Sequence, residues 1–298
     1  MRLLAALASI AVLAAPLSLR AEPVPAAVSI DPPRDKAHPA RMATLQIRSR
    51  GQAMNAVFYL ASGIGPHPTV ILFHGSPGNE QNLDLAQAIR RDGRNVLTLH
   101  YRGAWGSAGR YSISNAIEDS EAALAFVRDP QNVERYGLTP GKVAVIGHSL
   151  GGFLAARLGA KEPDLLGVGM IAAWNVGPDG PRMQALTPAQ YEDEFGDLAG
   201  RVVGADGRSL TAEAMAHQKD WSWDAYAPGL AKLPTLVVAA HDDGYADNIK
   251  LAQTLKSAGA QASLADIDTD HPFSDSRIAL EAAVLRWLEN LPGAPAGP

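Results

Sequence analysis

The sequence contains no cysteine, which excludes disulfides, thiolate nucleophiles and cysteine-ligated metal sites. Aromatic residues make up only 6% of the chain and charged residues 19%, whereas 47% of the residues are hydrophobic. Lysine and arginine do not occur in runs, and the formal net charge is -5, so no nucleic-acid partner is expected. What remains is the composition of one large globular domain with room for a sizeable core.

The first residues have the pattern of a targeting segment. Arg2 precedes an uncharged run over residues 3–19, which is followed by Arg20 and the small residue Ala21. This pattern predicts a signal peptide over residues 1–21, a periplasmic or secreted protein, and no integral membrane segment after cleavage. The alternative is an uncleaved membrane anchor, but the run is barely long enough to span a bilayer and Pro16 interrupts it.

Both ends of the remaining chain are rich in proline. Residues 22–42 predict an extended linker or surface arm, and residues 292–298 predict a flexible tail. The folded part is therefore expected between them, with a core formed by residues 43–174 and 233–291.

Short β-rich runs alternate with longer helical ones across this core, and the later strands are apolar. This pattern predicts an eight-stranded, mostly parallel sheet with helices on both faces, led by an antiparallel hairpin. The strands are expected at residues 43–48, 54–60, 69–73, 95–100, 143–147, 166–173, 235–240 and 262–268.

Helices are expected between most of these strands. One is predicted over 79–93 with Asn79 as its N-cap, and one over 113–127 with an apolar stripe. Another, over 275–291, is expected to bury Ile278, Leu285 and Leu288. Residues 175–232 are too long for one crossover helix, and we interpret them as a small helical cap inserted after the sixth strand; an irregular surface excursion is the alternative.

Ser149 lies in Gly147-His148-Ser149-Leu150-Gly151, a G-x-S-x-G pattern where a strand is predicted to end and a helix to begin. A sharp turn of this kind holds the serine in a strained conformation and needs small residues on either side. It also places the Leu150 N–H where it can face a developing oxyanion. The alternative is a glycine-rich turn with a serine that has no catalytic role.

A nucleophilic serine needs a base and an acid that orients the base. His271 follows the last predicted strand, and Pro272 favours an extended conformation for it. Asp242 and Asp243 follow the preceding strand, at the edge where ligands bind in open α/β sheets, and either can orient His271.

Four motifs, "HGSPGN", "YRGAWGSAG", "GHSLGG" and "DHPFSDSR", resemble those of the α/β-hydrolase superfamily, in its serine-peptidase-like and esterase-like branch. The resemblance covers residues 43–291 and implies an α/β-hydrolase fold. It implies that the Ser76 N–H supplies the second half of an oxyanion hole with Leu150. It also implies Asp243 as the acid, counted from Ala240, with Asp242 as the alternative.

Five aromatic residues are candidates for the wall of a substrate pocket: Tyr101, Trp105, Trp174, Trp221 and Trp223. Plain packing is the alternative for each of them. No metal-binding spacing such as H-E-x-x-H occurs, so neither a metal nor another cofactor is expected.

The sequence therefore predicts an exported serine hydrolase that cleaves carboxylic esters through Ser149, His271 and an aspartate, with a small-molecule ester or short peptide as substrate. A serine peptidase or aminoacyl-amide hydrolase is the alternative within the same fold. A noncatalytic binding protein is a third hypothesis, because a fold does not dictate an activity. The sequence leaves the oligomeric state open.

Overall fold

The computed structural model describes residues 23–292. The predicted signal peptide and all but the first residue of the predicted tail lie outside the described residues. Within them, no helix combines the length and the apolar character needed to cross a membrane.

The central element is one sheet of eight strands, and all eight predicted strands are confirmed. Their order is β1-β2-β4-β3-β5-β6-β7-β8. β1 pairs with β2 and β2 with β4 in antiparallel fashion, and every other pair is parallel. The strands are β1 (Arg41–Ser49), β2 (Gln52–Leu60), β3 (His67–Phe73), β4 (Asn95–Leu99), β5 (Leu138–His148), β6 (Val168–Ile171), β7 (Thr235–Ala240) and β8 (Ala262–Ile267).

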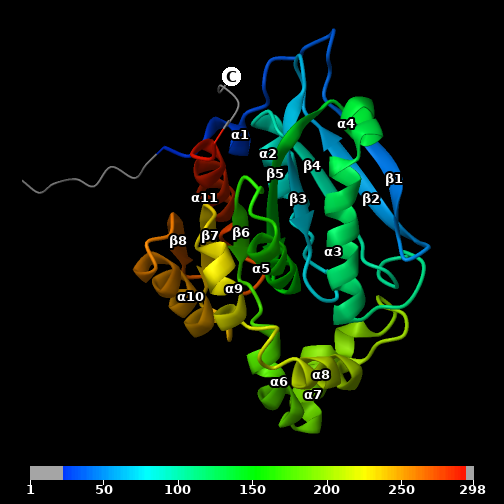
Figure 1. Ribbon diagram of the computed structural model, residues 1–298, viewed down its shortest axis with the longest axis vertical. Coiled ribbons are helices and arrows are strands. Elements are labelled where there is room, and N and C mark those ends of the chain that lie inside the picture. Colours follow the sequence, from blue (N-terminus) through cyan, green and yellow to red (C-terminus); the bar gives the residue numbers. More distant parts are fainter. Residues whose placement is uncertain (1–22, 293–298) are drawn as a thin grey trace, which may run out of the picture.

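Helices cover both faces of this sheet, as predicted (Figure 1). One face carries α3 (Ile113–Arg128), α4 (Pro130–Tyr136), α5 (Leu150–Lys161), α9 (Trp223–Leu230) and α10 (Tyr245–Ser257). The other face carries α1 (Ala26–Ser29), α2 (Leu83–Arg91) and α11 (Arg277–Glu289). The sheet is therefore buried on both sides, which explains why its parallel strands are continuous apolar runs.

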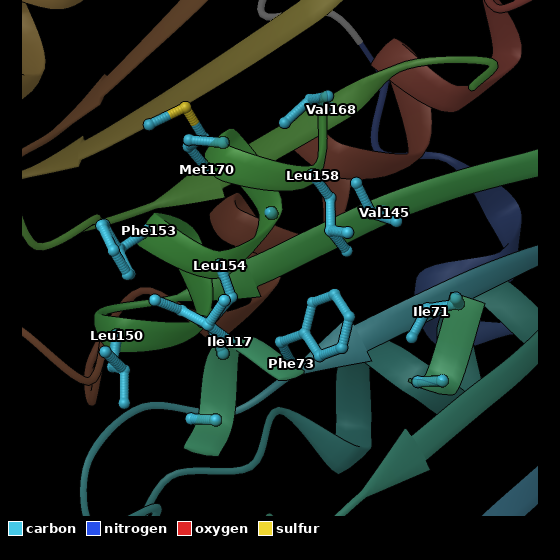
Figure 2. Packing of buried hydrophobic residues seen from close by; sticks show 14 of the residues in the cluster. Ile71, Phe73, Ile117, Val145, Leu150, Phe153, Leu154, Leu158, Val168 and Met170 are labelled. Atoms are coloured by element: carbon cyan, nitrogen blue, oxygen red, sulfur yellow. The ribbon is translucent and has the colours of Figure 1, made fainter. Parts of the chain in front are cut away.

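The larger core lies between the sheet and α3 and α5. Figure 2 shows Leu154 and Leu158 of α5 with Ile117 of α3, close to Phe73 of β3 and Val145 of β5. Phe73 and Leu154 are fully buried. This packing holds α5, which follows Ser149, against the strands that lead to the site.

Two helix predictions need correction. α2 begins at Leu83 with Asn82 at its N-cap position. The Asn79 side chain does not cap this helix and donates to the Asp197 carboxylate. In α11, Leu285 is buried as predicted, but Ile278 is 62% exposed. The helical stripe that faces the sheet begins later, at Leu280.

The predicted arm is folded onto the domain. Residues 26–29 form the short helix α1, whose Ala27 is buried. The Arg91 guanidinium of α2 donates to the backbone oxygens of Ala27 and Val28 over 2.6 and 2.9 Å. Residues 41 and 42 already belong to β1, so the extended region is shorter than predicted.

The interval 175–232 is mostly helical. It holds α6 (Val176–Gln184), α7 (Pro188–Phe195), the 3-10 turn Gly196–Leu198, α8 (Gly207–Ala216) and α9. The first helices lie beyond the end of the sheet where the parallel strands terminate (Figure 1). α9 differs, because a Cβ on its Gly229 would lie 2.4 Å from the Ala160 oxygen; this helix packs directly on α5.

Candidate active site

Ser149 occupies the turn between β5 and α5. Its backbone angles are φ 56° and ψ -120°, a conformation that costs free energy in any residue but glycine. The Ser149 backbone N–H donates to the Ile171 carbonyl oxygen over 2.9 Å, and the Ser149 carbonyl oxygen accepts from the Gly152 and Trp174 N–H groups. Leu150 is the first residue of α5, so its N–H has no partner within the helix. The turn therefore places a hydroxyl beside an available backbone donor.

The small residues that this turn needs are present. A Cβ on Gly147 would lie 2.0 Å from the Gly151 oxygen, and one on Gly151 would lie 2.3 Å from the Phe73 oxygen. Both atoms belong to the backbone and cannot move aside like a flexible side chain. The turn needs small residues on either side, and neither position has room for a Cβ.

His271 is paired with Asp242. The Nδ1 of His271 lies 2.6 Å from Oδ2 of Asp242, and the other carboxylate oxygen accepts from the Gly244 N–H over 2.9 Å. The structure thus pairs the imidazole with the alternative acid and not with Asp243. The partner of His271 is one residue earlier than the resemblance implied, because the chain turns immediately after β7 and the Gly244 N–H holds the Asp242 carboxylate.

His148 connects the nucleophile turn to the base. It directly precedes Ser149, and its Nε2–H donates to the backbone oxygen of His271 over 2.9 Å. The centroids of the His148 and His271 rings are 4.7 Å apart. Burial, followed by the neighbouring His271, lowers the pKa of His148 to about 3, so the ring is neutral. Sequence reasoning missed this role, although the position of His148 beside Ser149 was a signal for it.

The loop after β3 approaches Ser149 from the other side. A Cβ on Gly75 would lie 2.9 Å from Cβ of Ser149 and 3.5 Å from Nδ1 of His148. The backbone of this loop therefore touches the serine, and Ser76 follows at the next position. We refer to residues 74–78 below as the β3 loop.

Three side chains hold consecutive parts of the β3 loop by its carbonyl oxygens. The Tyr101 hydroxyl donates to the His74 oxygen over 2.8 Å, and Trp105 Nε1–H donates to the Pro77 oxygen over 2.7 Å. The Gly75 oxygen accepts from Nδ1–H of its neighbour His74. Tyr101 is fully buried and Trp105 is 37% exposed. Both were predicted as pocket-wall residues; in the structure they hold this loop, and neither lines the two hollows described below.

The other three predicted wall residues have different positions. Trp221 and Trp223 are buried in the core, and Trp221 stacks on His217 with ring centroids 4.1 Å apart. Trp174 is half-buried, and its backbone contacts Ser149: the Trp174 N–H donates to the Ser149 carbonyl oxygen over 3.1 Å. Its Nε1–H donates to Asp179 of α6. Of the three, Trp174 is therefore the one beside Ser149.

Two hollows flank the β3 loop. One, of about 350 Å³, extends along β2 and β4 to His74 and His100, and no aspartate, glutamate, lysine or arginine lines it. The other, of about 570 Å³, lies between Asn79 and Pro272, the neighbour of His271, and has Glu80, Asp84 and Arg277 in its wall. In the part of the chain covered by residues 23–292, no group of three or more histidine, aspartate or glutamate side chains is arranged to hold a metal ion.

Comparison with known proteins relates this geometry to a known fold. The sequence profile of the α/β-hydrolase fold matches residues 68–206. Bovine (Bos taurus) arylacetamide deacetylase is 37% identical over 73 residues, which are 24% of this chain and 17% of that protein. Lipase LipV of Mycobacterium tuberculosis is 27% identical over 221 residues, covering 64% of this chain and 80% of the lipase. The chain thus spans about a sixth of the deacetylase.

Solved structures agree in fold. EstE1, a thermostable carboxylesterase cloned from a metagenomic library, superposes with a TM-score of 0.59 at 22% identity, over 84% of this chain and 90% of that one. The strand order, the turn at Ser149 and these matches define the class: the protein has the α/β-hydrolase fold.

Proposed function

We propose that this chain is a serine hydrolase that cleaves carboxylic esters through an acyl-enzyme intermediate. The single observation that carries the proposal is the connection between Ser149 and the His271–Asp242 pair: His148, adjacent to the serine, donates to the backbone of His271. A base that is oriented by a carboxylate can activate a serine hydroxyl that comes within hydrogen-bond reach of its other nitrogen, and the backbone tie through His148 holds His271 next to the Ser149 turn.

In the proposed reaction, His271 takes the proton of the Ser149 hydroxyl through Nε2 as the oxygen attacks the acyl carbon. Asp242 accepts from Nδ1–H, which fixes the tautomer and stabilises the imidazolium that forms. The alcohol leaves with the proton from His271, and a water activated by the same ring releases the acid.

The negative charge of the tetrahedral intermediate needs donors that are already in place. We assign this role to the N–H groups of Leu150 and Ser76. Leu150 begins α5, and the β3 loop that carries Ser76 contacts Ser149 through Gly75. Loss of one such donor typically costs about 3 kcal/mol of transition-state stabilisation.

Esters are proposed as the substrate class because two relatives are named for ester hydrolysis, a lipase and a carboxylic ester hydrolase. The name of the arylacetamide deacetylase points to an amide, so amide hydrolysis is the alternative. The helices α6–α8, which lie beyond the strand ends, are proposed to act as the cap that selects the substrate. We also propose export. It rests on the residue pattern over 1–21, and an N-terminal sequence of the mature protein that begins at residue 22 would support it.

The test is turnover of nitrophenyl esters of increasing chain length and of aminoacyl anilides, by the parent protein and by Ser149→Ala. We expect ester turnover that the alanine variant lacks. Faster turnover of anilides would make the protein an amide hydrolase, and a parent protein that neither turns over these compounds nor reacts with a fluorophosphonate would be a binding protein.

A further inference from the structure

Two histidines outside the proposed triad, His74 and His100, are linked to the β3 loop. His74 is the first residue of this loop, and its side chain contacts the peptide group between Gly75 and Ser76. Nδ1 of His74 is 2.7 Å from the Gly75 oxygen. A carbonyl oxygen only accepts, so Nδ1 of His74 carries a proton. The Gly75 C=O and the Ser76 N–H belong to one peptide group, and this hydrogen bond therefore acts on the donor that we assign to the oxyanion.

The contact also fixes the other nitrogen of His74. The ring is 3% exposed, and burial, followed by the neighbouring His100, lowers its pKa to about 3, so it holds a single proton. Because that proton is on Nδ1, Nε2 is an acceptor. Nε2 lies 3.3 Å from Nδ1 of His100, which must therefore donate.

His100 is held in place by its own backbone. Its N–H donates to the Asn55 oxygen over 2.9 Å, and its carbonyl oxygen accepts from the Ser107 hydroxyl over 2.8 Å. The Ser107 oxygen in turn accepts from the Asn55 N–H. The imidazole of His100 thus projects from a rigid part of the sheet toward His74.

We propose that His100 is a positioning residue for the oxyanion site: it donates to His74, which donates to the Gly75 oxygen and so orients and polarises the peptide that carries the Ser76 N–H. The inference rests on the proposed function for its effect on rate. Hydrogen bonds in a chain strengthen one another, so a donor at His100 makes the Ser76 N–H a better donor at the far end.

The effect belongs to the transition state and the tetrahedral intermediate, because the oxyanion is absent from the bound substrate. Loss of the His100 donor should therefore lower kcat and leave KM unchanged. From the usual strength of one hydrogen bond, we expect about a three- to ten-fold loss.

The first experiment compares His100→Leu with His100→Asn, whose amide N–H can replace Nδ1–H. We expect the leucine variant to lose kcat and the asparagine variant to keep most of it. Thr98→Val, two residues earlier on the same face of β4, is the matched control and should keep the parent kcat. Equal losses in the leucine and asparagine variants, or a loss confined to KM, would overturn the proposal.

The second experiment is a double-mutant cycle with His74→Asn. Asparagine keeps a donor near the Gly75 oxygen but has no imidazole Nε2 to accept from His100. We expect His100→Leu to have almost no further effect in this background. The same fold loss in both backgrounds would show that His100 does not act through His74.

The third experiment measures the imidazole nitrogens directly by ¹⁵N NMR of the parent protein at pH 7. Both His74 and His100 should carry their proton on Nδ1, the less common tautomer of a free neutral histidine. A proton on Nε2 of either ring would refute the proposed chain. Because this readout needs no turnover, failure of the histidine chain is distinguishable from failure of the proposed ester hydrolysis.

Discussion

His271 and Asp242 are joined by a short hydrogen bond, Nδ1 to Oδ2 over 2.6 Å, in which the carboxylate is the better buried partner. The Asp242 side chain is 12% exposed and the His271 side chain 45%. The acid is therefore fixed inside the protein, while the base reaches the surface where a substrate can arrive.

The first prediction separates the two adjacent aspartates. Asp242→Asn should lower kcat by about 10²- to 10⁴-fold, because the amide stabilises the wrong tautomer of His271 and no longer stabilises its charged form. Asp243→Asn is the matched control and should stay within about three-fold of the parent. Ester hydrolysis under saturating substrate measures both, and a larger loss in the Asp243 variant would reverse the assignment.

The second prediction concerns the nucleophile turn. Gly151→Ala should destabilise the fold by about 2–4 kcal/mol, because its Cβ would lie 2.3 Å from the Phe73 oxygen and the strand and helix would have to separate. Gly65→Ala is the comparison, since its Cβ would meet the His67 ring at 3.3 Å and the Gly137 oxygen only at an ordinary contact distance of 3.6 Å. Urea unfolding of both variants is the measurement, and equal stability would show that α5 can move away from β3 without cost.

The third prediction concerns the indole that holds the β3 loop. Trp105→Phe removes the donor to the Pro77 oxygen and should lower kcat by about three- to ten-fold with little change in stability. Trp174→Phe, which removes the bond to Asp179, is the contrasting variant. We expect its effect in KM, because that bond holds α6 and not the β3 loop. If Trp105→Phe changed KM alone, its role would be that of a pocket wall.

The fourth prediction is a pH dependence of stability. Burial, followed by the negative charge of Asp84, raises the pKa of Glu281 from its ordinary value of 4.5 to about 7. The folded state therefore holds a proton that the unfolded state has lost, and the free energy of unfolding should fall as pH rises from 4.5 to about 7.

Glu281→Gln isolates this contribution, since the amide is neutral at every pH. The variant should gain stability relative to the parent across that interval, by up to about 3 kcal/mol. Unfolding at pH 4.5 and pH 7.5 gives the difference, and a constant offset between the two proteins would contradict the assignment.

The correct predictions from sequence share a physical cause. A strand buried on both faces must be apolar along its length, so runs such as residues 235–240 are recognisable without a structure. Ile278 shows the limit of helical periodicity. An apolar residue at the first turn of α11 fits the stripe by spacing, but the buried residues of this helix begin at Leu280 and Ile278 is 62% exposed.

What the sequence determined by itself is local: the Ser149 turn, because only glycine at positions 147 and 151 lets the backbones of β5, α5 and β3 approach so closely. What only the tertiary structure decided is which distant side chains meet there. Asp242 and Asp243 are the same residue type at adjacent positions, and the path of the chain after β7 decides that Asp242 pairs with His271. His74 and His100 likewise become partners only because β3 and β4 are neighbours in the sheet, 26 residues apart in the chain.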